Sequence, residues 1–271
     1  MRNQTRAVSA FLAAAPLVLA LTTPLAHAGS AASAALSFNV LAGSGFTWLM
    51  SPASYADTSA SAEEFAGFGL VAGTFSPNFG PAALDSNLSL GTAVPMSTAG
   101  TTAGSVFANA FSFGTPGNAT LQASALVSSE GRAAATSFAR SFFSLAPGAS
   151  VTFQGAVFLS VTGNNPSLPA NYNVSDFYGF ASGLLAVGSN EVLRELGGPA
   201  STGLVGSYSL NDTGPLSLTV TNMTASAMNS FLDSGVTVYS ASVVPEPGTY
   251  ALLIAGLAVV GFVARRRSQA A

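Results

Sequence analysis

Residues 151–162 have the sequence Val-Thr-Phe-Gln-Gly-Ala-Val-Phe-Leu-Ser-Val-Thr, and their alternation decides the fold class. Valine, leucine, phenylalanine and glycine occupy the odd positions, and small or polar residues occupy the even positions, with Phe158 as the one large exception. A period of two over this length is typical of a β-strand, because the apolar residues of a helix recur every three or four positions. We therefore expect a long strand with one buried face.

The same alternation continues on either side of this strand. Residues 106–113 and 119–128 alternate, and the Thr-Pro-Gly-Asn sequence at 115–118 between them predicts a turn. Many short strands between Gly, Pro and Asn turns favour an all-β fold, a single antiparallel β-sandwich or jelly-roll-like domain. Other strands are predicted at 36–41, 68–75, 84–90, 133–145, 176–187, 204–210, 216–220 and 236–243.

Several segments predict something other than a strand. Residues 29–35 are small and polar and predict a flexible start, and residues 51–66, rich in Ala and Ser, predict a short helix or a loop. The remaining segments of this kind are turns or loops at 78–81, 92–104 and 163–173, a helical turn or hairpin tip at 190–198, and a β-turn at Asn211-Asp212-Thr213-Gly214.

The first 28 residues have the composition of a secretory signal peptide. Arg2 and Arg6 precede an apolar run at 7–21, and Ala26-His27-Ala28 forms a small-x-small cleavage site. We expect an N-terminal signal helix, export through the Sec machinery and cleavage after Ala28.

Residues 244–271 contain three parts in order. Pro245 and Pro247, on either side of Glu246, lack a backbone N–H and end any regular element. The apolar residues 249–264 follow, and as a helix they span roughly 24 Å against a bilayer core of about 30 Å. Arg265, Arg266 and Arg267 then predict a cytoplasmic stop, so we expect a short C-terminal transmembrane helix.

This arrangement of Pro-Glu-Pro, apolar run and arginine cluster closely resembles the PEP-CTERM sorting tail of Gram-negative bacteria. The resemblance covers about the last tenth of the chain. It implies that the protein is anchored transiently in the inner membrane, processed by an exosortase near Pro245, Glu246 and Pro247, and passed to the cell surface or the extracellular matrix. Proteins with such tails are typically associated with exopolysaccharide and biofilm formation.

We therefore divide the chain into a signal peptide (1–28), a β-sandwich body (29–243) and a sorting tail (244–271). Only 7% of the residues are charged, against about a quarter in a typical chain. The body keeps three basic residues, Arg132, Arg140 and Arg194, and ten acidic ones, a net charge of −7, which excludes nucleic acid as a partner. There are no cysteines, so disulfides are excluded. A surface made of Ser, Thr, Asn and Gly suits a protein that meets sugars, and compositional drift explains it equally well.

The body lacks the usual catalytic residue types. The only histidine is His27 in the signal peptide, and the chain has no Cys and no Lys, which removes His- and Cys-based nucleophiles, His or Cys zinc sites and Schiff-base lysines. Carboxylate pairs remain, but no acidic residue lies in a glycosidase motif, and the adjacent Glu63 and Glu64 point apart in a strand. We predict no enzyme, no cofactor and no metal site.

The leading hypothesis is a structural, exopolysaccharide-associated surface or matrix protein. The alternative is a carbohydrate-binding module, for which the candidate aromatic residues are Tyr172, Phe177, Tyr178 and Tyr239. Ice binding ranks third, because it needs long ranks of Thr-x-Thr and only residues 219–221 fit. Trp48 is predicted to lie in the core. The sequons at Asn118, Asn173 and Asn222 fit N-glycosylation.

Overall fold

The computed structural model describes residues 29–49, 51–80, 82–90, 97–115, 118–128, 130–165, 178–197, 206–242 and 256–258. The chain divides into two compact units, and Ala28–Val244 forms one of them. The other unit combines Met1–His27 with Pro245–Ala271, and its described part is one helical turn at residues 256–258. No helix among the described residues is both long and apolar enough to cross a membrane. The predicted signal and transmembrane helices lie outside these residues, apart from that turn.

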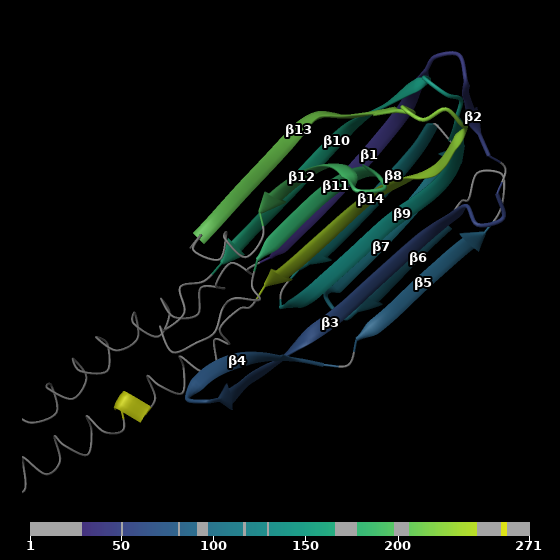
Figure 1. The fold of residues 1–271 in the computed structure, drawn as a ribbon. Helices are drawn as coiled ribbons and strands as arrows, with labels where there is room; N and C mark the ends of the chain where they lie inside the picture. Colours follow the sequence, from purple (N-terminus) through teal and green to yellow (C-terminus); the bar gives the residue numbers. More distant parts are fainter. Residues whose placement is uncertain are drawn as a thin grey trace, which may run out of the picture. The chain divides into compact units, whose positions relative to one another are not determined.

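The body is nearly all β, as predicted, with two antiparallel sheets (Figure 1). We call them sheet A and sheet B. Sheet A has the order β13 (Gly206–Thr221), β10 (Ser150–Asn165), β1 (Ser30–Ala42), β8 (Asn118–Val127), β7 (Val106–Thr115) and β6 (Ser97–Ala103). Sheet B has the order β12 (Asn190–Gly197), β11 (Gly179–Val187), β14 (Met228–Ser242), β9 (Gly131–Leu145), β3 (Tyr55–Val71) and β4 (Thr74–Phe79), with β5 (Ala83–Leu90) also on β3 and β2 (Phe46–Trp48) on β9.

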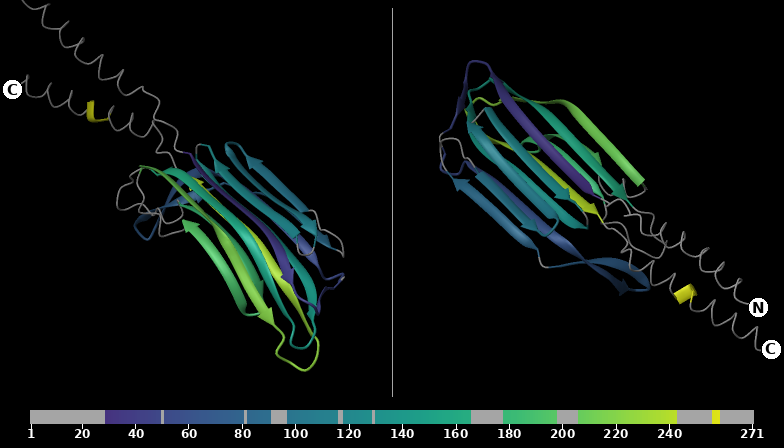
Figure 2. Two further views of the ribbon diagram at one scale, coloured as in Figure 1. Left: turned by 90° about the horizontal axis from the view of Figure 1, so that it is seen from above. Right: turned by 180° about the vertical axis from the view of Figure 1, so that it is seen from behind.

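The two sheets enclose one hydrophobic core, and their strands run in roughly the same direction (Figure 2). Along each strand alternate residues are buried, so that Val151, Phe153, Val157, Leu159 and Val161 of β10 all lie in the core, as their spacing predicts. Phe143 and Phe153 are its largest fully buried side chains. Trp48, which was predicted to lie in the core, is half-buried and packs against both rings at the border of the core.

The sheets approach each other closely because many inward-facing residues are small. The hydroxyls of Ser30 on β1 and Ser240 on β14 are 2.7 Å apart, and those of Thr58 on β3 and Ser97 on β6 are also 2.7 Å apart. A Cβ added at Gly183 of β11 would lie 2.5 Å from a methyl carbon of Val157 on β10. Alanine, serine and glycine therefore set the spacing of the layers, and hydrogen bonds satisfy these four buried hydroxyls.

Small residues also explain why three segments predicted as a flexible start, a short helix or loop, and a loop are strands. Residues 30–35 lie in β1, between β10 and β8, and residues 55–66 lie in β3, between β9 and β5. Likewise, residues 97–103 form β6. Residues 190–197, which contain no alanine or serine, form the edge strand β12 and not the predicted helical turn or hairpin tip. Alanine and serine have low strand propensity, but burial against the opposite sheet outweighs that preference.

Two predicted turns were also wrong. Asn78 and Phe79 pair with β3, and the chain instead turns at Ala72 and Gly73, both of which have positive φ. Residues 211–214 do not turn, because β13 pairs with β10 without interruption from Gly206 to Thr221. The two strands predicted on either side of this segment are therefore one continuous strand. Pro215 is tolerated there because β13 is the edge strand of sheet A.

Candidate functional site: the outer faces of the two sheets

Most of the site residues predicted from the sequence lie outside the described part of the chain. These are the cleavage residues Ala26 and Ala28, the sorting motif Pro245, Glu246 and Pro247, and the arginines at 265–267. Tyr172, Asn173 and Phe177 are also outside it.

The other two candidate sugar-binding aromatics, Tyr178 and Tyr239, contact each other. Their ring centroids are 4.7 Å apart and their planes are inclined by 33°. Both residues are half-buried, and Tyr239 lies opposite Phe180 on β11. The exposed, coplanar rings that a sugar platform requires are therefore not formed by this pair.

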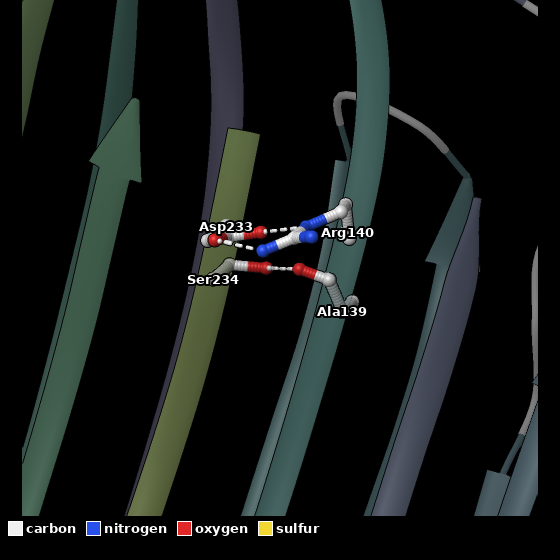
Figure 3. Close-up of polar contacts among 4 residues, drawn as sticks. All are labelled: Ala139, Arg140, Asp233 and Ser234. Carbon is white, nitrogen blue, oxygen red and sulfur yellow. Dashed lines mark hydrogen bonds and ion pairs between the residues drawn. The ribbon is translucent and has the colours of Figure 1, made fainter. Parts of the chain in front are cut away.

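The outer face of sheet B is held together by a charged pair on its two central strands. Arg140 of β9 and Asp233 of β14 are direct partners in the register, and the guanidinium donates two hydrogen bonds to the carboxylate, Nε to Oδ1 at 2.6 Å and Nη2 to Oδ2 at 2.7 Å (Figure 3). These hydrogen bonds raise the pKa of Arg140 above its ordinary value, and partial burial lowers it. Next to this pair, the Ser234 hydroxyl donates to the carbonyl of Ala139.

Aromatic rings pack around the Arg140 guanidinium. Its central carbon is 4.1 Å from the ring centroid of Phe231 and 5.6 Å from that of Tyr55. Phe231 in turn contacts Phe142, and Tyr55 stacks on Phe138. This face thus combines an ion pair, cation–π contacts and ring packing, which restrain its side chains.

The other two arginines of the body are paired as well. Arg132 contacts Glu63 at 2.6 Å and lies over the ring of Phe79, and Arg194 of β12 contacts Asp212 of β13 at 2.7 Å. Every positive charge in the body is therefore already matched by a carboxylate.

The outer face of sheet A has a different chemistry. Among the described residues, none of the side chains that point outward from its six strands is charged. Serine, threonine, asparagine and glutamine dominate, and the hydroxyls of Thr152 and Thr219 share a hydrogen bond across β10 and β13. Phe113 and Phe158 are 54% and 46% exposed on this face. It is therefore an uncharged polar face that also carries exposed aromatic rings.

Two hollows open on this face. One, of about 350 Å³, has Ser33 and Ala35 of β1 in its lining, with Phe158 on one side and Phe111 on the other. The second, of about 430 Å³, includes Ser37 and Asn39 of the same strand. Because residues 33, 35, 37 and 39 follow one another on the outer side of β1, the hollows lie side by side along that strand. We call them together the trough.

The aromatic residues predicted from the sequence to bind sugar do not include those of the outer face of sheet A. The pattern that could have identified this face lies in the even positions of β10, which combine Phe158 with threonine, glutamine, alanine and serine. What the sequence could not show is that the even face of β10 is flanked by the small residues of β1, because that depends on the pairing of strands far apart in the chain.

The acidic residues do not gather into a metal or catalytic cluster in the described part of the chain. No group of three or more Asp, Glu, His or Cys that could hold a metal occurs there. Glu63 and Glu64 point apart, as expected in a strand: Glu63 reaches Arg132, whereas the Glu64 carboxylate fills the space beside Gly104. The carboxylate of Asp85 on β5 accepts a hydrogen bond from the backbone amide of Gly100 on β6.

The sequon at Asn222 has a structural role instead. Asn222 is fully buried, and its amide donates to the carbonyls of Leu145 and Ser226. Its own side-chain oxygen accepts hydrogen bonds from the amide and the hydroxyl of Thr224. A side chain used in this way is not accessible for glycosylation in the folded protein, whereas Asn118 is exposed at the start of β8.

The comparisons with known proteins concern one short segment. Residues 243–267 match the family model described as the PEP-CTERM protein-sorting motif. No curated protein and no solved structure matches the chain. The chain thus carries a PEP-CTERM sorting motif, as its resemblance indicated, and the matched residues include Pro245, Glu246, Pro247 and all three arginines at 265–267.

Proposed function

We propose that this protein is a non-enzymatic β-sandwich protein of the extracellular matrix, delivered by an exosortase and associated with exopolysaccharide. The sorting motif at residues 243–267 carries the first part, because it implies an exosortase as processing partner, a membrane-anchored precursor and extracellular export. The uncharged, hydroxyl-rich face of sheet A supports the association with polysaccharide.

The proposed lack of catalysis rests on composition. Residues 29–271 contain no His, Cys or Lys, and the three arginines of the body are engaged in ion pairs. General acid–base or nucleophilic chemistry would therefore depend on carboxylates alone.

Fractionation of a tagged protein tests the delivery step. With a tag after Gly29, we expect the wild-type protein at the cell surface or in the medium. Changing Pro245, Glu246 and Pro247 together to alanine should leave membrane insertion intact, because the apolar run is untouched, and should stop release. Removing residues 250–267 is the matched control and should free the body without sorting. Release of the triple-alanine variant at the wild-type level would show that shedding does not depend on the sorting motif.

A carbohydrate-binding module is the second candidate, and the trough is the observation that favours it. A structural matrix protein needs only an inert surface, whereas a specific binder needs a shaped one with convergent polar groups. Co-sedimentation of the exported protein with purified matrix polysaccharide distinguishes them. Saturable retention indicates a specific binder, and retention that rises in proportion to concentration indicates a structural component.

A further inference from the structure

The trough arises from a run of small side chains on the central strand of sheet A. On the outer side of β1 stand Ser33, Ala35 and Ser37, whereas the neighbouring strands carry larger residues such as Gln154 and Phe158 on β10 and Gln122 on β8. The floor is therefore low along β1 and bordered on both sides. From Ser33 to Asn39 it runs for roughly 20 Å at about 3.4 Å per residue.

We propose that the trough binds an extended strand of a neutral polysaccharide. This inference rests on the proposed association with polysaccharide and goes further, because it names the surface, the residues and the charge class of the glycan.

Two phenyl rings flank the trough near one of its ends, one ring on each side. Phe158 pairs with Ala35, Ala35 with Gln122, and Gln122 with Phe111, so the two phenylalanines stand at opposite ends of one row across four strands. Three strand spacings separate their backbones by roughly 14 Å. Phe113, the next outward residue of β7, stacks on Phe111 with ring planes 11° apart. The C–H face of a sugar ring packs on such rings, and the exposed part of Phe158 is available for this contact.

Amide side chains supply the hydrogen-bonding groups along the trough. Within the described chain, the side chains of Asn39, Asn109, Asn118, Gln122 and Gln154 line the trough and make no hydrogen bond there. Each amide offers donors and an acceptor, which matches the mixed character of sugar hydroxyls. By contrast, hydroxyls outside the trough, such as those of Thr152 and Thr219, bond to each other.

The charge of the body selects the class of glycan. The described outward-facing residues of sheet A carry no charge, the body has a net charge of −7, and its three arginines are already paired. An anionic polymer would find no counter-charge and would meet the overall repulsion. Phenylalanines occur at protein interfaces too, but the face lacks the Tyr, Trp and Arg residues that contribute most of the binding energy there, which disfavours a protein partner.

Native affinity electrophoresis of the exported protein tests the proposal. Gels would contain dextran, xylan or galactomannan as neutral probes and dextran sulfate or alginate as anionic probes. We expect retardation by at least one neutral polysaccharide and none by the anionic ones. Removing both rings (Phe111→Ala with Phe158→Ala) or filling the floor (Ala35→Glu) should weaken the binding roughly tenfold or more. The matched controls on sheet B, Leu88→Ala and Ser59→Glu, should bind like the wild type. Melting curves establish that each variant is folded.

The outcomes separate this inference from the proposed function. Retardation that persists in both trough variants places polysaccharide binding elsewhere and overturns the inference, while the proposed function stands. Retardation by anionic probes only overturns the neutral class. Absence of retardation by every probe, together with no co-sedimentation with the matrix polysaccharide, removes the proposed association itself. A concentration-dependent dimer that Ala35→Glu abolishes would identify a second copy of this chain as the occupant instead.

Discussion

On sheet B, the guanidinium of Arg140 is fixed by Asp233 and covered by the ring of Phe231, whereas on sheet A the ring of Phe158 stands exposed beside amides that bond to nothing in the described chain. Both faces come from alternating strands of similar length. On sheet B an ion pair and packed rings among the outward side chains hold the strands together, and on sheet A the amide side chains and the ring of Phe158 are left available. This difference is the basis of our proposal that sheet B stabilises the body and that sheet A binds the polysaccharide.

Substitutions on the inner faces of the sheets should have the largest effect on stability, because the inward-facing residues set the distance between the two sheets. Ala60 of β3 is almost fully buried against sheet A, and its neighbour Ser59 is exposed on the outer face of sheet B. Ala60→Leu should lower the free energy of unfolding by about 3 kcal/mol, because overpacking forces the sheets apart. Ser59→Leu should change it by less than about 0.5 kcal/mol. Urea unfolding curves measure both, and equal effects would contradict the assignment of inner and outer residues.

Removing the carboxylate of Asp233 should have the next largest effect. The two side chains of the pair are 29% and 16% exposed, so solvent screens the loss only in part. We expect Asp233→Ala to lower the free energy of unfolding by about 1–2 kcal/mol. Asp57→Ala, on the same face but exposed, is the control and should change it by less than about 0.5 kcal/mol. If the two variants unfold alike, the pair does not hold sheet B together.

The same substitution, phenylalanine to alanine, can be made on the outer faces of both sheets and compares their contributions to stability directly. Phe231→Ala removes a ring that packs on Arg140 and Phe142, and should cost about 1 kcal/mol in the free energy of unfolding. Phe158→Ala on sheet A removes a ring with 46% exposure and should cost less than that. Thermal denaturation of the two variants side by side gives the ranking. A larger loss for Phe158→Ala would mean that this ring is structural and not kept for a ligand.

The sequence was informative wherever large apolar residues alternate with polar ones. The β10 strand and its buried face were predicted from residues 151–161, and the motif at 243–267 was recognised from its own residues. Prediction was wrong for residues 30–35 of β1, residues 55–66 of β3 and the whole of β6, because their buried inward residues are alanine, serine and threonine, which become core residues only when a second sheet covers them. The strength of that burial is a tertiary property, and it is not visible in local propensity.

The candidate site was less predictable than the fold for the same reason. Phe111 and Gln122 lie in one hairpin, but Phe158 comes from a strand much further along the chain, and only the register of β8 and β10 with β1 places all three residues in one row. The aromatic residues chosen from the sequence included Tyr178 and Tyr239, which pack on each other. Composition indicated an uncharged surface, but the distribution of the few charges over the two sheets required the structure.

The most direct test of the account is the NMR spectrum of the side-chain amides in the ¹⁵N-labelled exported protein. A short soluble fragment of the neutral polysaccharide that retards the protein most would be added stepwise. We predict that the NH₂ signals of Asn109, Asn118 and Gln122 on sheet A shift, while those of the exposed Asn190 and Asn229 on sheet B do not. Shifts at Asn190 and Asn229 with none at the trough would contradict the division of roles between the two faces.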